Sequence, residues 1–251
     1  MNFRLFFLAV TLCLVACVVP SDAEPLPLQV LPSDAPGDST ADVLGTAPDT
    51  VRYLALGDSY TIGESVSDAG DWPNQLVDSL SIRMAETHFE PADILATTGW
   101  TTSNLSYAID QQQIETSTYN LVSLLIGVNN QYQNLSLEAY EIEFAALLDR
   151  SVDLAGGNAD RVFVVSIPDY GYTPFGQPNQ MAISQDLMLF NSACSVLTAN
   201  AGISHYNITG ISQQWPSADN WVAQDGLHPS QNQYAAWVAS FAEAVEMQLR
   251  D

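Results

Sequence analysis

The segment NLVSLLIGVNN at residues 120–130 carries the strongest fold signal in the sequence. It is an apolar run without polar alternation that ends at Gly127, and such a run predicts a strand buried on both faces. The segments RYLALG at 52–57 and RVFVVSI at 161–167 have the same character. Strands of this kind belong to parallel sheets, whose crossover helices cover both faces.

Stretches with helical spacing of apolar residues separate these strands. The spacing predicts further strands at 93–98 and 204–208, and helices at 72–84, 101–112, 137–155, 181–200 and 229–249, with Pro229 in the first turn of the last helix. This alternation predicts an α/β protein, a three-layer α/β/α sandwich with a five-stranded parallel sheet of the flavodoxin-like kind. Ligands of such sheets bind at the carboxyl ends of the strands, so the loops there should carry the functional site.

Four short motifs fall on that edge of the predicted sheet. GDSY at 57–60, Gly99 and GVNN at 127–130 each end a predicted strand, and DGLHP at 225–229 precedes the last helix. Acyl transfer needs a nucleophile, a base, a group that orients the base, and donors for the oxyanion. Ser59 is the candidate nucleophile and His228 the candidate base, with Asp225 placed three residues earlier to hold the imidazole.

The oxyanion donors can be predicted from the same motifs. The backbone N–H groups of Ser59 and Gly99 and the side-chain amide of Asn129 can surround the developing negative charge. Gly99 has no Cβ, which permits a close approach of substrate to its N–H group.

Taken in chain order, the four motifs resemble the sequence blocks of the SGNH, or GDSL, hydrolases, and the resemblance covers residues 52–249. It implies the SGNH hydrolase fold and ester hydrolysis through an acyl-enzyme, without metal or cofactor. It also assigns the triad to Ser59, Asp225 and His228, and the oxyanion hole to Ser59, Gly99 and Asn129. The third block usually reads GxND, and here Asn130 replaces the Asp, which puts the local loop geometry in doubt.

The substrate is less well defined by the sequence. A Pro- and Gly-rich segment at 168–180 is predicted to cover the substrate, and the lack of a long apolar insertion favours small acyl groups, such as short acyl or O-acetyl esters of small molecules or carbohydrates. An acyltransferase and a non-catalytic, glycan-binding envelope lipoprotein remain alternatives. Several aromatic residues could line the cleft or pack at its rim: Tyr60, Trp100, Tyr132, Tyr170, Tyr172 and Phe175.

The N-terminus reads as a targeting signal. Arg4 precedes an apolar run at 5–19 that is shorter than the roughly 20 residues of a membrane-spanning helix, so it predicts a secretory signal. The sequence LVAC at 14–17 resembles a bacterial lipobox, which implies removal of residues 1–16 and acylation of Cys17. An ordinary signal peptide cleaved after Ala23 is the alternative. Val18 favours an outer-membrane anchor in the bacterial cell envelope.

Charge and composition indicate the domain boundary and limit the possible binding partners. Residues 17–50 are rich in Pro and acidic residues and predict a disordered tether, which leaves the hydrolase domain at 51–251. With 29 acidic and 6 basic residues and a net charge of −23, the chain is unsuited to nucleic acid or to electrostatic adhesion to anionic lipid, so the lipid anchor would be its only membrane contact. We expect a monomer.

Overall fold

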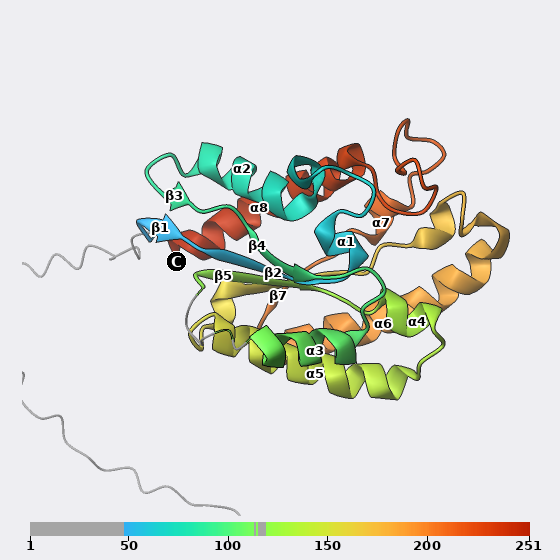
Figure 1. Cartoon of the computed structure of the whole chain (residues 1–251), viewed down its shortest axis with the longest axis horizontal. Coiled ribbons are helices and arrows are strands. Elements are labelled where there is room, and N and C mark those ends of the chain that lie inside the picture. The colour runs from blue at the N-terminus through green and yellow to red at the C-terminus, as the bar shows by residue number, and fades with distance from the viewer. Residues whose placement is uncertain (1–47, 113, 115–118) are drawn as a thin grey trace, which may run out of the picture. The chain divides into compact units, whose positions relative to one another are not determined.

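Five parallel strands form the centre of the structure, a computed structural model that describes residues 48–112, 114 and 119–251 (Figure 1). The three central strands, at 53–57, 121–125 and 162–165, are fully buried and rich in Val and Leu, as expected for strands covered on both faces. The predicted parallel five-stranded sheet is thus confirmed. In spatial order the strands are β4 (Asp93–Ala96), β2 (Tyr53–Gly57), β5 (Leu121–Leu125), β6 (Val162–Val165) and β7 (Ser204–Tyr206).

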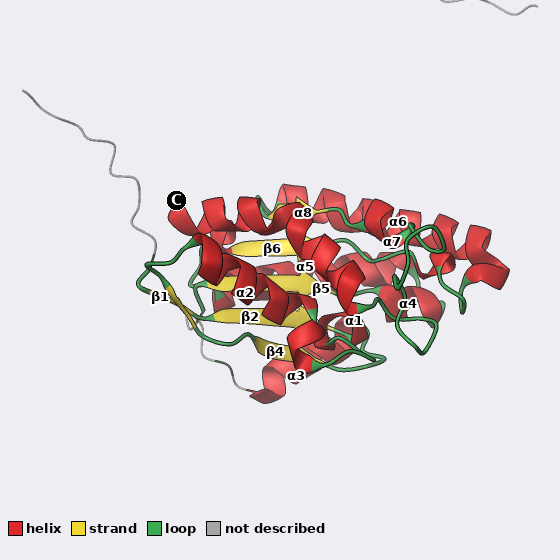
Figure 2. Ribbon diagram, turned by 90° about the horizontal axis from the view of Figure 1, so that it is seen from above, coloured by secondary structure: helices red, strands yellow, loops and turns green. Residues whose placement is uncertain are grey.

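Helices cover both faces of this sheet and complete the predicted three-layer sandwich (Figures 1 and 2). The helices α2 (Trp72–Arg83) and α8 (Gln231–Arg250) pack together on one face. The opposite face carries α3 (Thr102–Gln112), α5 (Leu137–Leu154) and α6 (Gln180–Asn200). The largest fully buried side chains of the core include Trp72, Trp237, Tyr53, Tyr140, Tyr234, Phe144, Phe163 and Phe241.

The last helix begins later than the sequence predicts. Ser230 is its N-cap, and the Ser230 hydroxyl accepts a hydrogen bond from the backbone N–H of Gln233 at 3.3 Å. Pro229 therefore lies before the helix, where it pairs with Val222 in an isolated bridge.

Several short elements were not predicted, because they are too brief to show a periodic pattern. Thr50 and Val51 form β1, which pairs in parallel with β3 (His88–Phe89), so the expected tether over 17–50 ends inside a small second sheet. The other short elements are α1 (Ser59–Ile62), α4 (Val128–Tyr132), α7 (Thr209–Ser212), η1 (Asp68–Gly70), η2 (Ala159–Arg161), η3 (Tyr170–Tyr172) and η4 (Gln177–Asn179).

The strand order places a topological switch point between β2 and β5. The chain passes from β2 to its neighbour β4 on one side and then returns to β5 on the other. Ligand sites in open α/β sheets lie at such a point, outside the carboxyl ends of the strands. The short helices α1 and α4 follow β2 and β5 at this end of the sheet (Figure 1).

The N-terminal predictions fall mostly outside the described residues. The signal peptide at 1–16, Cys17 and the tether up to residue 47 are not among them. None of the helices in the described ranges has the length and apolar character needed to cross a membrane.

Candidate active site

Ser59 is the first residue of α1, and Asp58 alone separates it from the buried strand β2. Asp58 caps this helix, and its Oδ1 accepts a hydrogen bond from the backbone N–H of Tyr60 at 3.0 Å. The turn is tight, because a Cβ at Gly57 would lie 2.0 Å from the Thr61 hydroxyl and 2.5 Å from a backbone oxygen of β5. Glycine at this position therefore lets the chain bring Ser59 to the sheet edge.

Asp58, which precedes the candidate nucleophile in the chain, is fully buried. Its Oδ2 has no hydrogen-bond partner among the described residues. Burial raises the pKa of Asp58 to about 7, although the hydrogen bond from Tyr60 N–H works in the opposite direction. The carboxyl therefore gains or loses its proton near neutral pH.

His228 and Asp225 form a close pair in the loop before α8. His228 Nδ1 lies 2.6 Å from Asp225 Oδ2, and Asp225 Oδ1 accepts hydrogen bonds from the backbone N–H groups of Leu227 and His228 at 2.8 and 3.0 Å. Burial works to raise the pKa of Asp225, but hydrogen bonds from His228, Ser65 and the backbone outweigh it and lower the pKa to about 2. Asp225 is thus a carboxylate at neutral pH and can hold the Nδ1–H tautomer, which leaves Nε2 as the proton acceptor.

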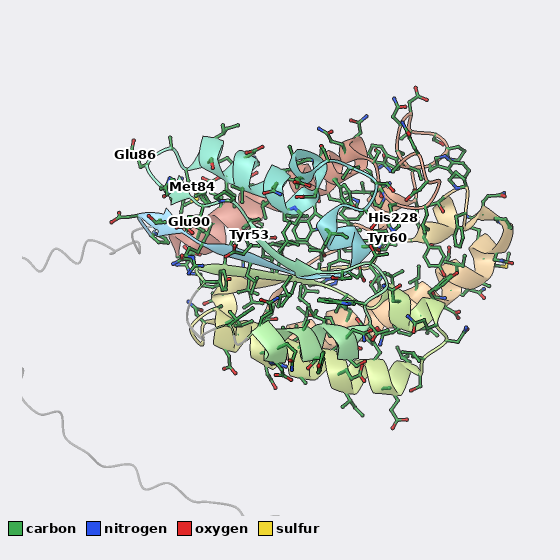
Figure 3. The ribbon with its side chains drawn as sticks, viewed as in Figure 1. Tyr53, Tyr60, Met84, Glu86, Glu90 and His228 are labelled. Atoms are coloured by element: carbon green, nitrogen blue, oxygen red, sulfur yellow. The ribbon has the colours of Figure 1, made fainter. Side chains whose placement is uncertain are left out.

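Ser59 and His228 line the same cavity of about 250 Å³. Figure 3 shows His228 next to Tyr60 at the end of the sheet where α1 lies, and the two rings meet edge to face with centroids 5.6 Å apart. Within the described part of the chain, no hydrogen bond joins the Ser59 hydroxyl to His228. Such contacts are often long in unliganded enzymes and tighten when substrate binds.

The three predicted oxyanion donors line this cavity as well. Among the described residues, the backbone N–H groups of Ser59 and Gly99 donate no hydrogen bond, so both are available to a ligand. Gly99 has φ +85 and open space where a Cβ would stand. Asn129 Nδ2 donates one hydrogen to the Trp100 carbonyl at 2.9 Å, which fixes the amide and leaves its second hydrogen free.

Asn130, the departure from the family pattern, is fully buried and has hydrogen-bond partners on both sides of its amide. Its Oδ1 accepts from Thr102 N–H at 3.0 Å, and its Nδ2 donates to Thr102 Oγ1 at 2.7 Å. The Thr102 hydroxyl in turn donates to Glu143 Oε2. Since that hydroxyl has already given its only proton to Glu143, it needs a donor opposite it, and an amide supplies one where a carboxylate cannot. Asn at position 130 therefore fits the loop, because Thr102 needs a hydrogen-bond donor opposite its hydroxyl and the Asn130 amide supplies it.

An aromatic wall forms one side of the cavity. Tyr132, Tyr170 and Phe175 are mutual neighbours, with ring centroids 6.3 to 6.4 Å apart. Tyr170 and Phe175 come from the segment 168–180, and Phe175 N–H donates to Gly226 O at 3.0 Å, which ties this segment to the loop that carries His228. The lining residues are Ser59, Tyr60, Thr98, Gly99, Val128, Asn129, Tyr132, Tyr170, Phe175, Leu227 and His228.

Two of the expected cleft residues lie elsewhere. Trp100 is not among the lining residues, because the chain turns at Gly99 and the Trp100 side chain packs partly buried against the hydrophobic core. Tyr172 borders a separate groove along α6 instead. Thr98, Val128 and Leu227 line the cavity without having been predicted, and their only sequence signal is that they adjoin the motif residues.

The sequence and the fold both match a known family. The model of the GDSL-like lipase/acylhydrolase family matches residues 55–236, which is most of the chain. The chain belongs to this family. No curated protein matches it.

Solved structures similar to this GDSL-like hydrolase support the fold. The lipase Lip_vut3 from a goat rumen metagenome has a TM-score of 0.63 at 15% identity, covering 78% of this chain and 97% of its own. The acetylxylan esterase Axe2 from Geobacillus stearothermophilus has a TM-score of 0.57 at 18% identity, covering 80% and 95%. The psychrotrophic esterase EstA from Pseudoalteromonas sp. has a TM-score of 0.57 at 14% identity, covering 81% and 100%.

Proposed function

We propose that this GDSL-like hydrolase is a serine esterase that cleaves short acyl or O-acetyl esters through an acyl-enzyme. The observation that carries the proposal is the 2.6 Å contact between His228 Nδ1 and Asp225 Oδ2, at a cavity that His228 shares with Ser59. A histidine oriented by a carboxylate beside a serine is the arrangement that activates a hydroxyl for acyl transfer.

In the first step, Ser59 Oγ attacks the ester carbonyl carbon while His228 Nε2 takes the hydroxyl proton. The carbonyl oxygen becomes an oxyanion, and the free N–H groups of Ser59 and Gly99 and the Asn129 amide stabilise it. The tetrahedral intermediate then expels the alcohol, which leaves with the proton from His228. The acyl group stays bound to Ser59 Oγ as an ester.

In the second step, water attacks the acyl-enzyme and gives its proton to His228 Nε2. The same donors stabilise the second oxyanion. When this intermediate collapses, the bond to Ser59 Oγ breaks, the serine takes back a proton from His228, and the carboxylic acid leaves. Asp225 stays ionised throughout and stabilises the imidazolium that forms in each step.

The cavity argues for a small, uncharged acyl group. Its volume of about 250 Å³ lies below the range of about 300–1,000 Å³ that is typical of sites for drug-sized ligands. Aromatic and aliphatic side chains line it together with Ser59, Thr98, Asn129 and His228, and the lining contains no Asp, Glu, Lys or Arg. Burial also raises the pKa of Tyr170 to about 12, so its phenol stays neutral. The small volume favours short acyl chains, and the lack of Asp, Glu, Lys and Arg in the lining favours uncharged ones.

Hydrolysis of p-nitrophenyl esters from acetate to laurate tests this proposal. We expect kcat/KM to be highest for the shortest chains, and Ser59→Ala to abolish hydrolysis. Ser67→Ala is the matched control, because Ser67 is exposed and its hydroxyl caps nothing. Folded protein that is inactive on the whole series, and also on acetylated sugars, would contradict the proposal. Release of p-nitrophenol only when an alcohol acceptor is added would instead indicate an acyltransferase.

We also propose that acylated Cys17 anchors the protein in the bacterial cell envelope, in the outer membrane. The support is the LVAC segment at 14–17 behind an apolar run. Labelled palmitate should be incorporated when the full chain is expressed in a Gram-negative bacterium, and Cys17→Ser should lose the label and the membrane association. A released, unlabelled protein beginning after Ala23 would establish the ordinary signal peptide instead.

A further inference from the structure

Ser65 contacts the acid of the proposed triad from outside the motifs. Its Oγ donates a hydrogen bond to Asp225 Oδ2 at 2.7 Å, and this is the oxygen that lies 2.6 Å from His228 Nδ1. We propose that Ser65 is a positioning residue, whose hydroxyl holds the Asp225 carboxylate in the orientation that His228 needs. This role rests on the proposed serine esterase function.

The backbone at Ser65 is held in an unusual conformation. Its φ is +70, in the left-handed region that non-glycine residues seldom adopt and that persists only where the surroundings enforce it. Glycine would relieve this strain but would carry no hydroxyl. The presence of serine at such a position is explained if its hydroxyl has a function.

Local hydrogen bonds connect Ser65 to the nucleophile. Glu64 N–H donates to the Ser59 carbonyl at 3.0 Å, and Val66 N–H donates to the Gly63 carbonyl at 3.0 Å. The segment 59–66 is therefore one short unit that begins at the nucleophile. Among the described residues, the hydrogen bond from the Ser65 hydroxyl is the one side-chain hydrogen bond between this unit and the loop at 225–228. It joins two positions that lie 160 residues apart in the sequence.

The charges around Asp225 indicate how the Ser65 hydroxyl affects the His228 imidazole. The Asp225 side chain is about 30% exposed, so water can replace Ser65 at Oδ2, but two backbone N–H groups would then hold the carboxylate through Oδ1 alone. Two ionisable side chains sense the Asp225 charge, Tyr60 on the nucleophile side and Tyr234 on α8: burial raises the pKa of each, and nearby carboxylates that include Asp58 and Asp225 add to the rise. The hydroxyl dipole offsets part of the negative charge that faces His228, and its removal should therefore favour the protonated imidazole.

The test compares Ser65→Ala and Ser65→Gly with Ser67→Ala as the loop control. Both Ser65 variants should lower kcat/KM roughly threefold to tenfold on the preferred ester, consistent with losing part of one charge-assisted hydrogen bond. Both should move the acidic limb of the kcat/KM profile to higher pH by about half a unit, and Ser67→Ala should leave it unchanged. Only Ser65→Gly should raise thermal stability, because it alone removes the backbone strain.

A second readout does not depend on catalysis. The chain has three histidines, so the imidazole titration of His228 can be followed by NMR and assigned with His228→Ala. Its midpoint should move to higher pH in both Ser65 variants. An unchanged titration, or different shifts for the Ala and Gly variants, would overturn the positioning role. If the wild type hydrolyses no ester, the proposed function fails, and the titration still decides whether Ser65 acts on the Asp225–His228 pair.

Discussion

Substitution Asn130→Asp would restore the usual family residue, and we expect it to destabilise this protein. Asn130 is fully buried, and its amide donates to the Thr102 hydroxyl at 2.7 Å, while that hydroxyl donates to Glu143. A carboxylate at 130 has no proton to give, so two carboxylates would compete for one hydroxyl proton. A buried polar group left without its partner costs about 1–3 kcal/mol, and more when it is charged.

We therefore expect a loss of about 3 kcal/mol in the free energy of unfolding at pH 8. For a domain of about 200 residues this corresponds to a fall in Tm of about 6–12 °C. Burial should raise the pKa of the new carboxyl in the folded state, so the folded state binds the proton more readily than the unfolded one. The deficit is then present above that pKa and shrinks as the pH falls through it, because a protonated carboxyl can donate to Thr102.

Thermal and urea denaturation at pH 8 and pH 5 measure these changes. Asn134→Asp is the control, since it makes the same charge change at an exposed position of the following turn. Glu143→Gln should be nearly neutral alone, because its amide oxygen can still accept from Thr102. Combined with Asn130→Asp, it should recover about 1–2 kcal/mol, since the new amide can donate to the hydroxyl. Strictly additive effects in the double variant would refute the proton arrangement that we infer.

Three further outcomes follow from the site. Asn129→Ala should lower kcat by roughly 10²–10³ with little change in KM, as expected for a donor used mainly in the transition state, in steady-state assays on the preferred ester. Phe175→Ala removes a half-exposed part of the aromatic wall, so the ratio of kcat/KM for laurate to that for acetate should rise while Tm changes little. Asp58→Asn should flatten the pH dependence of stability between about pH 4 and pH 7. The raised pKa of Asp58 gives stability that is full at acid pH and is lost as the pH rises through about 7, at no more than about 1.4 kcal/mol per pH unit.

The regular core of the fold could be predicted because buried strands appear in the sequence as continuous apolar runs and amphipathic helices as periodic ones. The runs at 52–57, 120–127 and 161–167 contain the fully buried strands β2, β5 and β6, and the five-stranded sheet is parallel as predicted. The helices α1 and α4 hold Ser59 and Asn129, yet they have four and five residues and show no period. Their places were predicted only through the motifs that they carry.

The contacts that adjust the site could not be predicted, because they join residues far apart in the sequence and depend on proton direction. Ser65 reaches Asp225 only after the segment 59–66 has curled back, and a serine in a polar loop carries no signal of this. Asn130 departs from the third motif, and the sequence does not show that its partner Thr102 donates to Glu143 and therefore accepts from an amide. In both cases the contact depends on one hydroxyl outside the motifs. The motifs thus carry the proposed chemistry, while the hydroxyls of Ser65 and Thr102, outside the motifs, contact residues that the motifs supply.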